Sequence, residues 1–229
     1  MIWLLYGILI SLSLGGLINH LVVQSKWASA FGNKNFMTFL IGVVSLHGVS
    51  FLLILTFVSA HSVSLATAFG FHSPRRLQAL GLAVLVAAIA LPMAWWLGQV
   101  SALVMEWFHV APQEQIPVQT LRATEAPGQK VFFAVMAIGF VPFVEELLFR
   151  GILYPTVKQR IHPVLALWGT ALIFAGIHLN VVTFVPLTVL AVLLTWLYER
   201  TDNLLAPILT HSLFNAANYY WLVTQPQAN

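Results

Sequence analysis

Two adjacent glutamates, Glu145 and Glu146, lie in an apolar stretch that continues to Arg150. A carboxylate in hydrocarbon costs at least about 2.5 kcal/mol on insertion scales, so a neighbouring pair of them indicates a function. Because successive helical residues point about 100° apart, we expect the two carboxylates to have different surroundings. The four-residue spacing places Glu146 and Arg150 on one helix face, where they can form an ion pair. Glu145 is then available to activate a water molecule or to contact another helix.

A proline just upstream supports the reading of this segment as a site. Pro142 has no backbone N–H, so we expect a kink that makes room for water beside Glu145. The alternative, on this segment alone, is a salt bridge at a helix end. In that arrangement both glutamates extend along the helix to reach the lipid headgroups.

Two further polar groups follow in later apolar stretches. His178 lies near the end of one of them, and alone it fits an interfacial histidine as well as a catalytic one. His211 and Asn215 are four residues apart, so they share a helix face, and both side chains can donate hydrogen bonds. For His211 and Asn215 the alternative is a purely structural role, in which they form hydrogen bonds between membrane helices.

The composition places these residues in a membrane protein. Of 229 residues, 59% are hydrophobic and 7% are charged, whereas a soluble domain carries about 25% charged residues. The mean hydropathy is +0.88. So little charge cannot cover a water-exposed surface, so the apolar excess must face lipid. The chain has no cysteine, which excludes disulfides, thiol nucleophiles and cysteine metal ligands. The basic residues are scattered, which argues against nucleic-acid binding.

Apolar stretches of the length of a membrane crossing, about 20 residues, recur along the chain. They lie at 3–23, 36–60, 77–97, 131–149, 164–178, 182–198 and 204–223. The sequence therefore predicts an all-α, polytopic transmembrane bundle of seven to eight spans. The stretch 77–108 is too long for one straight crossing, so we expect a tilt, a break near Gly98 or an additional short helix. We divide the chain into N-terminal transmembrane helices (1–108), a polar loop (109–130), a catalytic transmembrane core (131–224) and a short tail (225–229).

Together, the three polar groups are far more specific than each one alone. The order Glu-Glu-x-x-x-Arg, Phe-x-x-x-His, His-x-x-x-Asn on successive membrane helices resembles the CAAX-type (CPBP) intramembrane glutamate endopeptidases, a family that includes Abi proteins. The resemblance covers about residues 131–220, and residues 1–108 correspond to the variable part of such proteins. It implies an intramembrane endopeptidase that cleaves membrane-associated or prenylated-like substrates.

The resemblance also implies roles for the motif residues. Glu145 would be the base that deprotonates water, with His178 assisting it. His211 and Asn215 would stabilise the oxyanion, and Glu146 would hold the first motif through its ion pair with Arg150. These assignments fit the need of peptide hydrolysis for an activated water molecule and a set of oxyanion donors.

The main mechanistic alternative is a zinc-dependent form of the same protease. Two histidines and a glutamate are typical zinc ligands, and Glu145, His178 and His211 would then bind the metal. We favour a mechanism without a cofactor, because Asn215 is a good neutral donor but a rare zinc ligand. His47, in the second apolar stretch, is interpreted as a hydrogen-bonded core histidine, with a place beside the substrate as the alternative.

Two other functional classes remain possible at this stage. They are a transport-type membrane protein and a non-catalytic immunity protein that keeps the family fold. The first would show repeated or broken helices, and the chain shows no such repeat. We expect membrane lipids and a peptide or protein substrate as partners, and we expect the protein in a bacterial plasma membrane.

Overall fold

The computed structural model describes residues 2–24, 34–71 and 76–225, and every regular element in these ranges is a helix. Among the described residues, four helices are long and apolar enough to cross a membrane, namely Lys34–Ala60, Leu77–Trp107, Pro127–Lys158 and Val181–Thr201. Two shorter apolar helices are Tyr6–Val22 and Pro163–Gly176. The protein is thus an all-α polytopic membrane protein, which confirms the predicted fold class.

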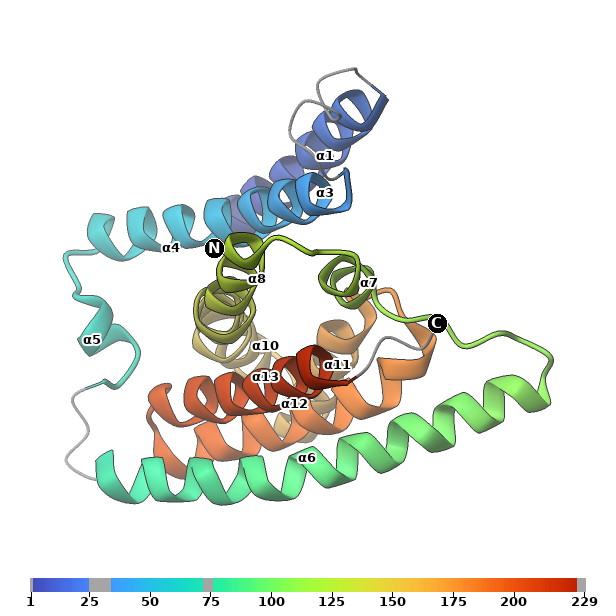
Figure 1. The fold of residues 1–229 in the computed structure, drawn as a ribbon. Helices are drawn as coiled ribbons and strands as arrows, with labels where there is room; N and C mark the ends of the chain where they lie inside the picture. Colours follow the sequence, from blue (N-terminus) through green and yellow to red (C-terminus); the bar gives the residue numbers. More distant parts are fainter. Residues whose placement is uncertain (1, 25–33, 72–75, 226–229) are drawn as a thin grey trace.

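The helices occupy all seven predicted apolar stretches (Figure 1). In chain order they are α1 (Ile2–Gln24), α3 (Lys34–Gly42), η1 (Val43–Gly48), α4 (Val49–Ala60), α5 (Leu65–Ala68), α6 (Arg76–Trp107), α7 (Ile116–Arg122), α8 (Pro127–Ala134), η2 (Val135–Phe140), α9 (Val141–Glu146), η3 (Leu147–Leu153), α10 (Tyr154–Lys158), α11 (Pro163–Gly176), α12 (Val181–Thr201) and α13 (Leu205–Thr224). The elements η1, η2 and η3 are π-helical turns inside longer helices.

The structure refines two sequence expectations at this level. The stretch 77–108 neither breaks near Gly98 nor contains an additional helix, because α6 is one continuous helix that tolerates Pro92 in its interior. The predicted polar loop 109–130 contains the short helix α7, and α8 already begins at Pro127. Proline fits the first turn of a helix, where its missing N–H costs nothing.

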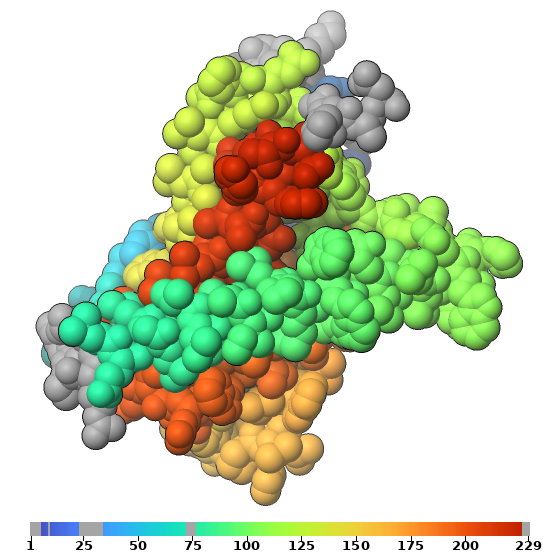
Figure 2. Space-filling view, turned by 60° about the horizontal axis from the view of Figure 1, so that its bottom comes forward, coloured from blue at the N-terminus to red at the C-terminus, as the bar shows by residue number. Residues whose placement is uncertain are grey.

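The helix from α8 to α10 lies between two groups of helices (Figure 1). On one side, η1 contacts α9, and α1 packs along α3, η1 and α4. On the other side, α13 contacts η2 and α9, while α6 packs against both α12 and α13. The space-filling view shows α6 crossing that face beside α12 and α13 (Figure 2). The central helix can therefore receive side chains from both groups.

Small residues allow α6 and its neighbours to approach closely. Ala83, Ala90 and Ala94 of α6 are buried against α12 and α13, where Leu194 and Leu197 are fully buried. Association of helices in lipid depends on such close packing, because the hydrophobic effect does not drive it there. The opposite face of α6 exposes large apolar side chains, including Trp95 and Leu103. This outer face is suited to contact lipid.

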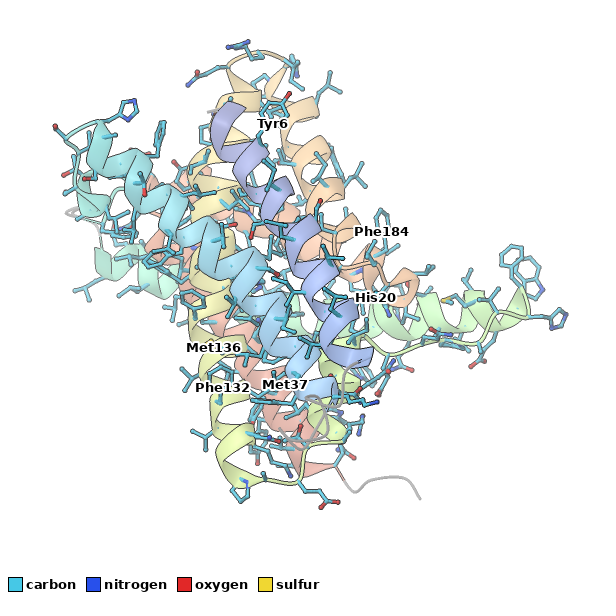
Figure 3. All side chains as sticks on the ribbon, turned by 90° about the horizontal axis from the view of Figure 1, so that it is seen from above. Tyr6, His20, Met37, Phe132, Met136 and Phe184 are labelled. Atoms are coloured by element: carbon cyan, nitrogen blue, oxygen red, sulfur yellow. The ribbon has the colours of Figure 1, made fainter. Side chains whose placement is uncertain are left out.

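Aromatic stacking attaches the N-terminal helices to the central helix. The rings of Phe39 and Phe133 are stacked with centroids 3.8 Å apart, and Phe36 meets Phe132 edge-on at 5.7 Å. Seen from above, Met37 of α3 lies beside Phe132 of α8 (Figure 3). These contacts set the position of the helix that carries His47.

Candidate active site

The candidate active site lies where the π turn η1 meets the central helix, which itself contains the π turns η2 and η3. η1 contains His47, η2 precedes Glu145, and η3 contains Arg150. A π turn adds a residue to a helical turn and changes the direction of the side chains that follow, and such turns are frequent at functional sites. Two of these turns carry a polar side chain and the third precedes the two glutamates, which marks this part of the bundle as a site.

Glu146 and Arg150 form the ion pair that their spacing predicts. Arg150 Nη1 donates to Glu146 Oε1 at 2.7 Å, and both side chains are almost completely buried. Arg150 also donates to Thr195 Oγ1 at 3.3 Å and to the Ala191 carbonyl at 2.9 Å, so it ties η3 to α12. The guanidinium lies 4.9 Å from the ring centroid of Phe174. Multiple hydrogen bonds of this kind are what a buried charge requires.

Glu145 points toward the N-terminal helices. Its Oε1 lies 3.1 Å from Nε2 of His47, which therefore donates a hydrogen bond to it across the η1–α9 contact. Glu145 is 7% exposed and Glu146 is 0% exposed. The alternative in which both glutamates extend to the lipid headgroups is therefore wrong, because both carboxylates are enclosed by neighbouring helices.

His211 lies between the two carboxylates. Its Nδ1 is 2.8 Å from Glu146 Oε1, and its Nε2 is 3.8 Å from Glu145 Oε2. The expectation that the two glutamates have separate surroundings is therefore only half right. Their side chains diverge, but the ring of His211 is wide enough to reach one oxygen of each. Since Nδ1 donates to Glu146, Nε2 is the nitrogen available near Glu145.

His178 approaches this cluster from the end of α11. It lies two residues beyond the helix, which ends at Gly176. Its Nδ1 donates to the Phe174 carbonyl at 2.7 Å, which leaves Nε2 for another partner. The rings of His178 and His211 both contact the ring of Phe174, at 5.0 and 5.9 Å between centroids.

Asn215 faces the central helix from α13, one turn after His211, but its amide is already engaged. Its Nδ2 donates to the carbonyl of Ala137 at 2.8 Å. At the end of η2 the N–H of Val141 bonds to Met136 O, five residues back. With the same spacing residue 142 would bond to Ala137 O, but Pro142 has no N–H. Asn215 therefore supplies the donor that Pro142 lacks, and its second N–H is left for other use.

This compensation predicts non-additive effects on stability. Asn215→Ala leaves the Ala137 carbonyl unsatisfied, so we expect a cost of about 1–3 kcal/mol in the free energy of unfolding in detergent. In a Pro142→Ala background the new backbone N–H can bond to that carbonyl, so Asn215→Ala should cost clearly less. Asn218→Ala is the matched control, because Asn218 donates only to Phe214 of its own helix. If Asn215→Ala lowered the free energy of unfolding equally in the wild type and in the Pro142→Ala background, Asn215 would not be replacing the donor that Pro142 lacks.

The residues proposed as zinc ligands are only partly arranged for a metal. Nδ1 of His211 and of His178 each donate to an acceptor, as the outer nitrogen of a ligating histidine does. However, within residues 2–24, 34–71 and 76–225 no three acidic or histidine side chains are grouped so that they could hold one ion. The side chains as placed do not fit the predicted ligand set, so we derive no step through a metal.

Sequence reasoning underestimated one residue of this site. His47 was expected to be a hydrogen-bonded core histidine, and it is hydrogen-bonded, but its partner is Glu145. The available signal was a histidine within a span that is otherwise apolar. No spacing rule links residue 47 to residue 145, because they lie on different helices.

Comparisons with known proteins agree with the motifs. Residues 127–217 match the family model described as type II CAAX prenyl endopeptidase Rce1-like. A protein of Bacillus subtilis (strain 168), described as uncharacterized protein YpbD, is 30% identical over 119 residues, or 49% of this chain. The match spans 56% of that relative. No solved structure matches the chain. The matches confirm the resemblance to the CAAX-type family that the three motifs predict.

Proposed function

We propose that this multi-pass membrane protein is an intramembrane endopeptidase. The premise is the match of residues 127–217 to the Rce1-like CAAX endopeptidases. Its substrates would be membrane-associated or prenylated-like peptides. We place it in a bacterial plasma membrane, with lipids and a peptide or protein substrate as its partners. The chain spans about half of the relative it matches, so its activity is inferred from the site and the family together.

The observation that best supports this function is the arrangement of Glu145. This carboxylate is buried, is held by His47 through Oε1, and presents Oε2 toward Nε2 of His211 at 3.8 Å. Buried carboxylates are normally paired with a cation, as Glu146 is with Arg150. Glu145 instead has histidines as its neighbours, and histidine is the side chain best able to exchange protons with a substrate.

In the proposed reaction Glu145 takes a proton from water while the water oxygen adds to the scissile carbonyl carbon. The carbonyl oxygen becomes an oxyanion. It would accept one hydrogen bond from Nε2–H of protonated His211 and another from the free N–H of Asn215. The carboxylate of Glu146 on Nδ1 of His211 would stabilise the charged ring, as the aspartate does in serine protease triads. The proton on Glu145 then passes to the amide nitrogen, with His178 assisting, while the carbonyl re-forms and the C–N bond breaks to release the amine.

The experiment that tests this function is cleavage of a peptide library by the protein reconstituted in lipid vesicles. Mass spectrometry should detect products with the wild type and with Glu125→Gln, a change at an exposed loop position. The same products should be absent with Glu145→Ala. No cleavage by the wild type of either prenylated or unmodified peptides would contradict the proposal and favour a non-catalytic or transport-type protein.

A second test separates the cofactor-free mechanism from the zinc-dependent alternative. We expect purified protein to contain no stoichiometric zinc and to keep its rate of cleavage after prolonged treatment with a membrane-permeant chelator. The reason is that Asn215, a rare zinc ligand, belongs to the set that would stabilise the oxyanion. Loss of activity on chelation, with recovery on addition of zinc, would instead make Glu145, His178 and His211 the ligands.

A further inference from the structure

We propose that His47 is a positioning residue of the active site, supplied by the N-terminal helices. It holds Oε1 of Glu145 so that Oε2 faces His211 and the reacting water. The inference rests on the proposed function and extends it, since His47 lies outside residues 127–217, the part of the chain that matches the family model.

The contact itself defines the orientation of the carboxylate. A glutamate carboxylate rotates freely about its last bond unless one oxygen is held, and His47 Nε2 holds Oε1 at 3.1 Å. The side chains of His47 and Glu145 are 12% and 9% exposed, so water competes little for this bond. The remaining oxygen is the one nearest to His211 Nε2. The hydrogen bond thus selects which oxygen is available to act as the base.

The second nitrogen of His47 shows that the ring is not placed for stability alone. Nδ1 is buried and has no hydrogen-bond partner within the described ranges. By contrast, Nδ1 of His61 and of His178 each donate to the carbonyl four residues earlier in the chain. Buried polar atoms of the fold are normally satisfied, and exceptions are found at functional sites. His47 therefore gives up a local hydrogen bond in order to reach Glu145.

The packing around η1 holds His47 at this position. Ser11 of α1 donates to the Ser45 carbonyl at 2.5 Å, and Gly15 lies so close to Ser45 that no side chain fits there. On the other side, the ring of Phe51 meets Phe140 at 6.0 Å and Phe143 at 5.9 Å, both edge-on. The N-terminal helices therefore serve the chemistry as well as membrane anchoring, because they bring His47 to α9.

The test compares two substitutions of His47 with one of His61. His47→Leu removes the donor, so we expect kcat to fall by about 10²-fold, the cost of misplacing a reacting group by roughly 1 Å. KM should stay within about twofold, because the substrate contacts are unchanged. His47→Gln keeps an N–H near the position of Nε2 and should recover most of the lost turnover. His61→Leu is the control, since His61 is exposed near the end of the same helix.

Thermal unfolding in detergent identifies variants whose loss of activity reflects misfolding. Wild-type turnover in a folded His47→Leu variant would overturn the inference and leave the proposed function intact. So would equal losses of kcat in folded His47→Leu and His47→Gln, because the hydrogen bond would then not be the cause. Absence of cleavage by the wild type would overturn the proposed function, and this inference with it.

Discussion

Replacement of Glu145 by glutamine is expected to lower kcat by about 10²–10⁴-fold, the range for loss of a positioned general base. Glutamine has the shape of glutamate and can still accept the hydrogen bond of His47 through its oxygen, so the site should keep its geometry. It cannot take a proton from water. The measurement is the rate of peptide cleavage in vesicles, with kcat and KM determined separately.

Two observations make this prediction specific to the chemistry. Thermal unfolding of Glu145→Gln should match that of the wild type, because an uncharged side chain is easier to bury than a carboxylate. Glu125→Gln, with the same change at an exposed position, should leave kcat unchanged. A folded Glu145→Gln protein with a kcat within about tenfold of the wild type would exclude Glu145 as the base.

Loss of Arg150 is expected to have the largest effect on stability. Arg150→Met leaves the carboxylate of Glu146 buried at 0% exposure without its cation, and breaking a buried pair in this way costs about 3–5 kcal/mol. It also removes the bonds to Thr195 and Ala191 that tie η3 to α12. The measurement is the free energy of unfolding in mixed micelles, together with the yield of folded protein.

The exposed pair Lys158–Glu199 is a matched control for this effect. Its atoms lie 2.6 Å apart, but its side chains are 35% and 39% exposed, so Lys158→Met should cost no more than about 1 kcal/mol. Combining Arg150→Met with Glu146→Leu should restore part of the stability, since no unpaired charge then remains. If Arg150→Met and Lys158→Met lowered the free energy of unfolding by the same amount within error, the assigned role of the buried pair would be contradicted.

Glu146→Gln distinguishes architecture from chemistry at the same position. We expect it to lower the folded yield at least as much as it lowers turnover, because Glu146 Oε1 accepts from both Arg150 and His211. A normal yield with complete loss of cleavage would give Glu146 a direct part in the reaction. Glu145→Gln and Glu146→Gln can be compared in the same detergent.

Much of the fold followed from local properties of the chain. Apolar stretches long enough to cross a membrane predict helices at all seven positions where the structure has them, because in lipid the backbone must satisfy its own hydrogen bonds. The Glu146–Arg150 contact was predictable for the same reason, since a spacing of four residues on a helix places two side chains together. The order of the three motifs predicted the resemblance to the CAAX-type endopeptidases, whose family model residues 127–217 match.

The site itself was decided by the packing of helices that are distant in the sequence. His47 and Glu145 are 98 residues apart, Glu146 and His211 are 65 apart, and Ala137 and Asn215 are 78 apart. Whether such residues meet depends on how the helices cross and on where π turns change the direction of their side chains. Periodicity within a helix shows which face a side chain occupies but not which helix that face meets. For that reason the sequence identified Glu145, and only the tertiary structure identified His47 as its partner.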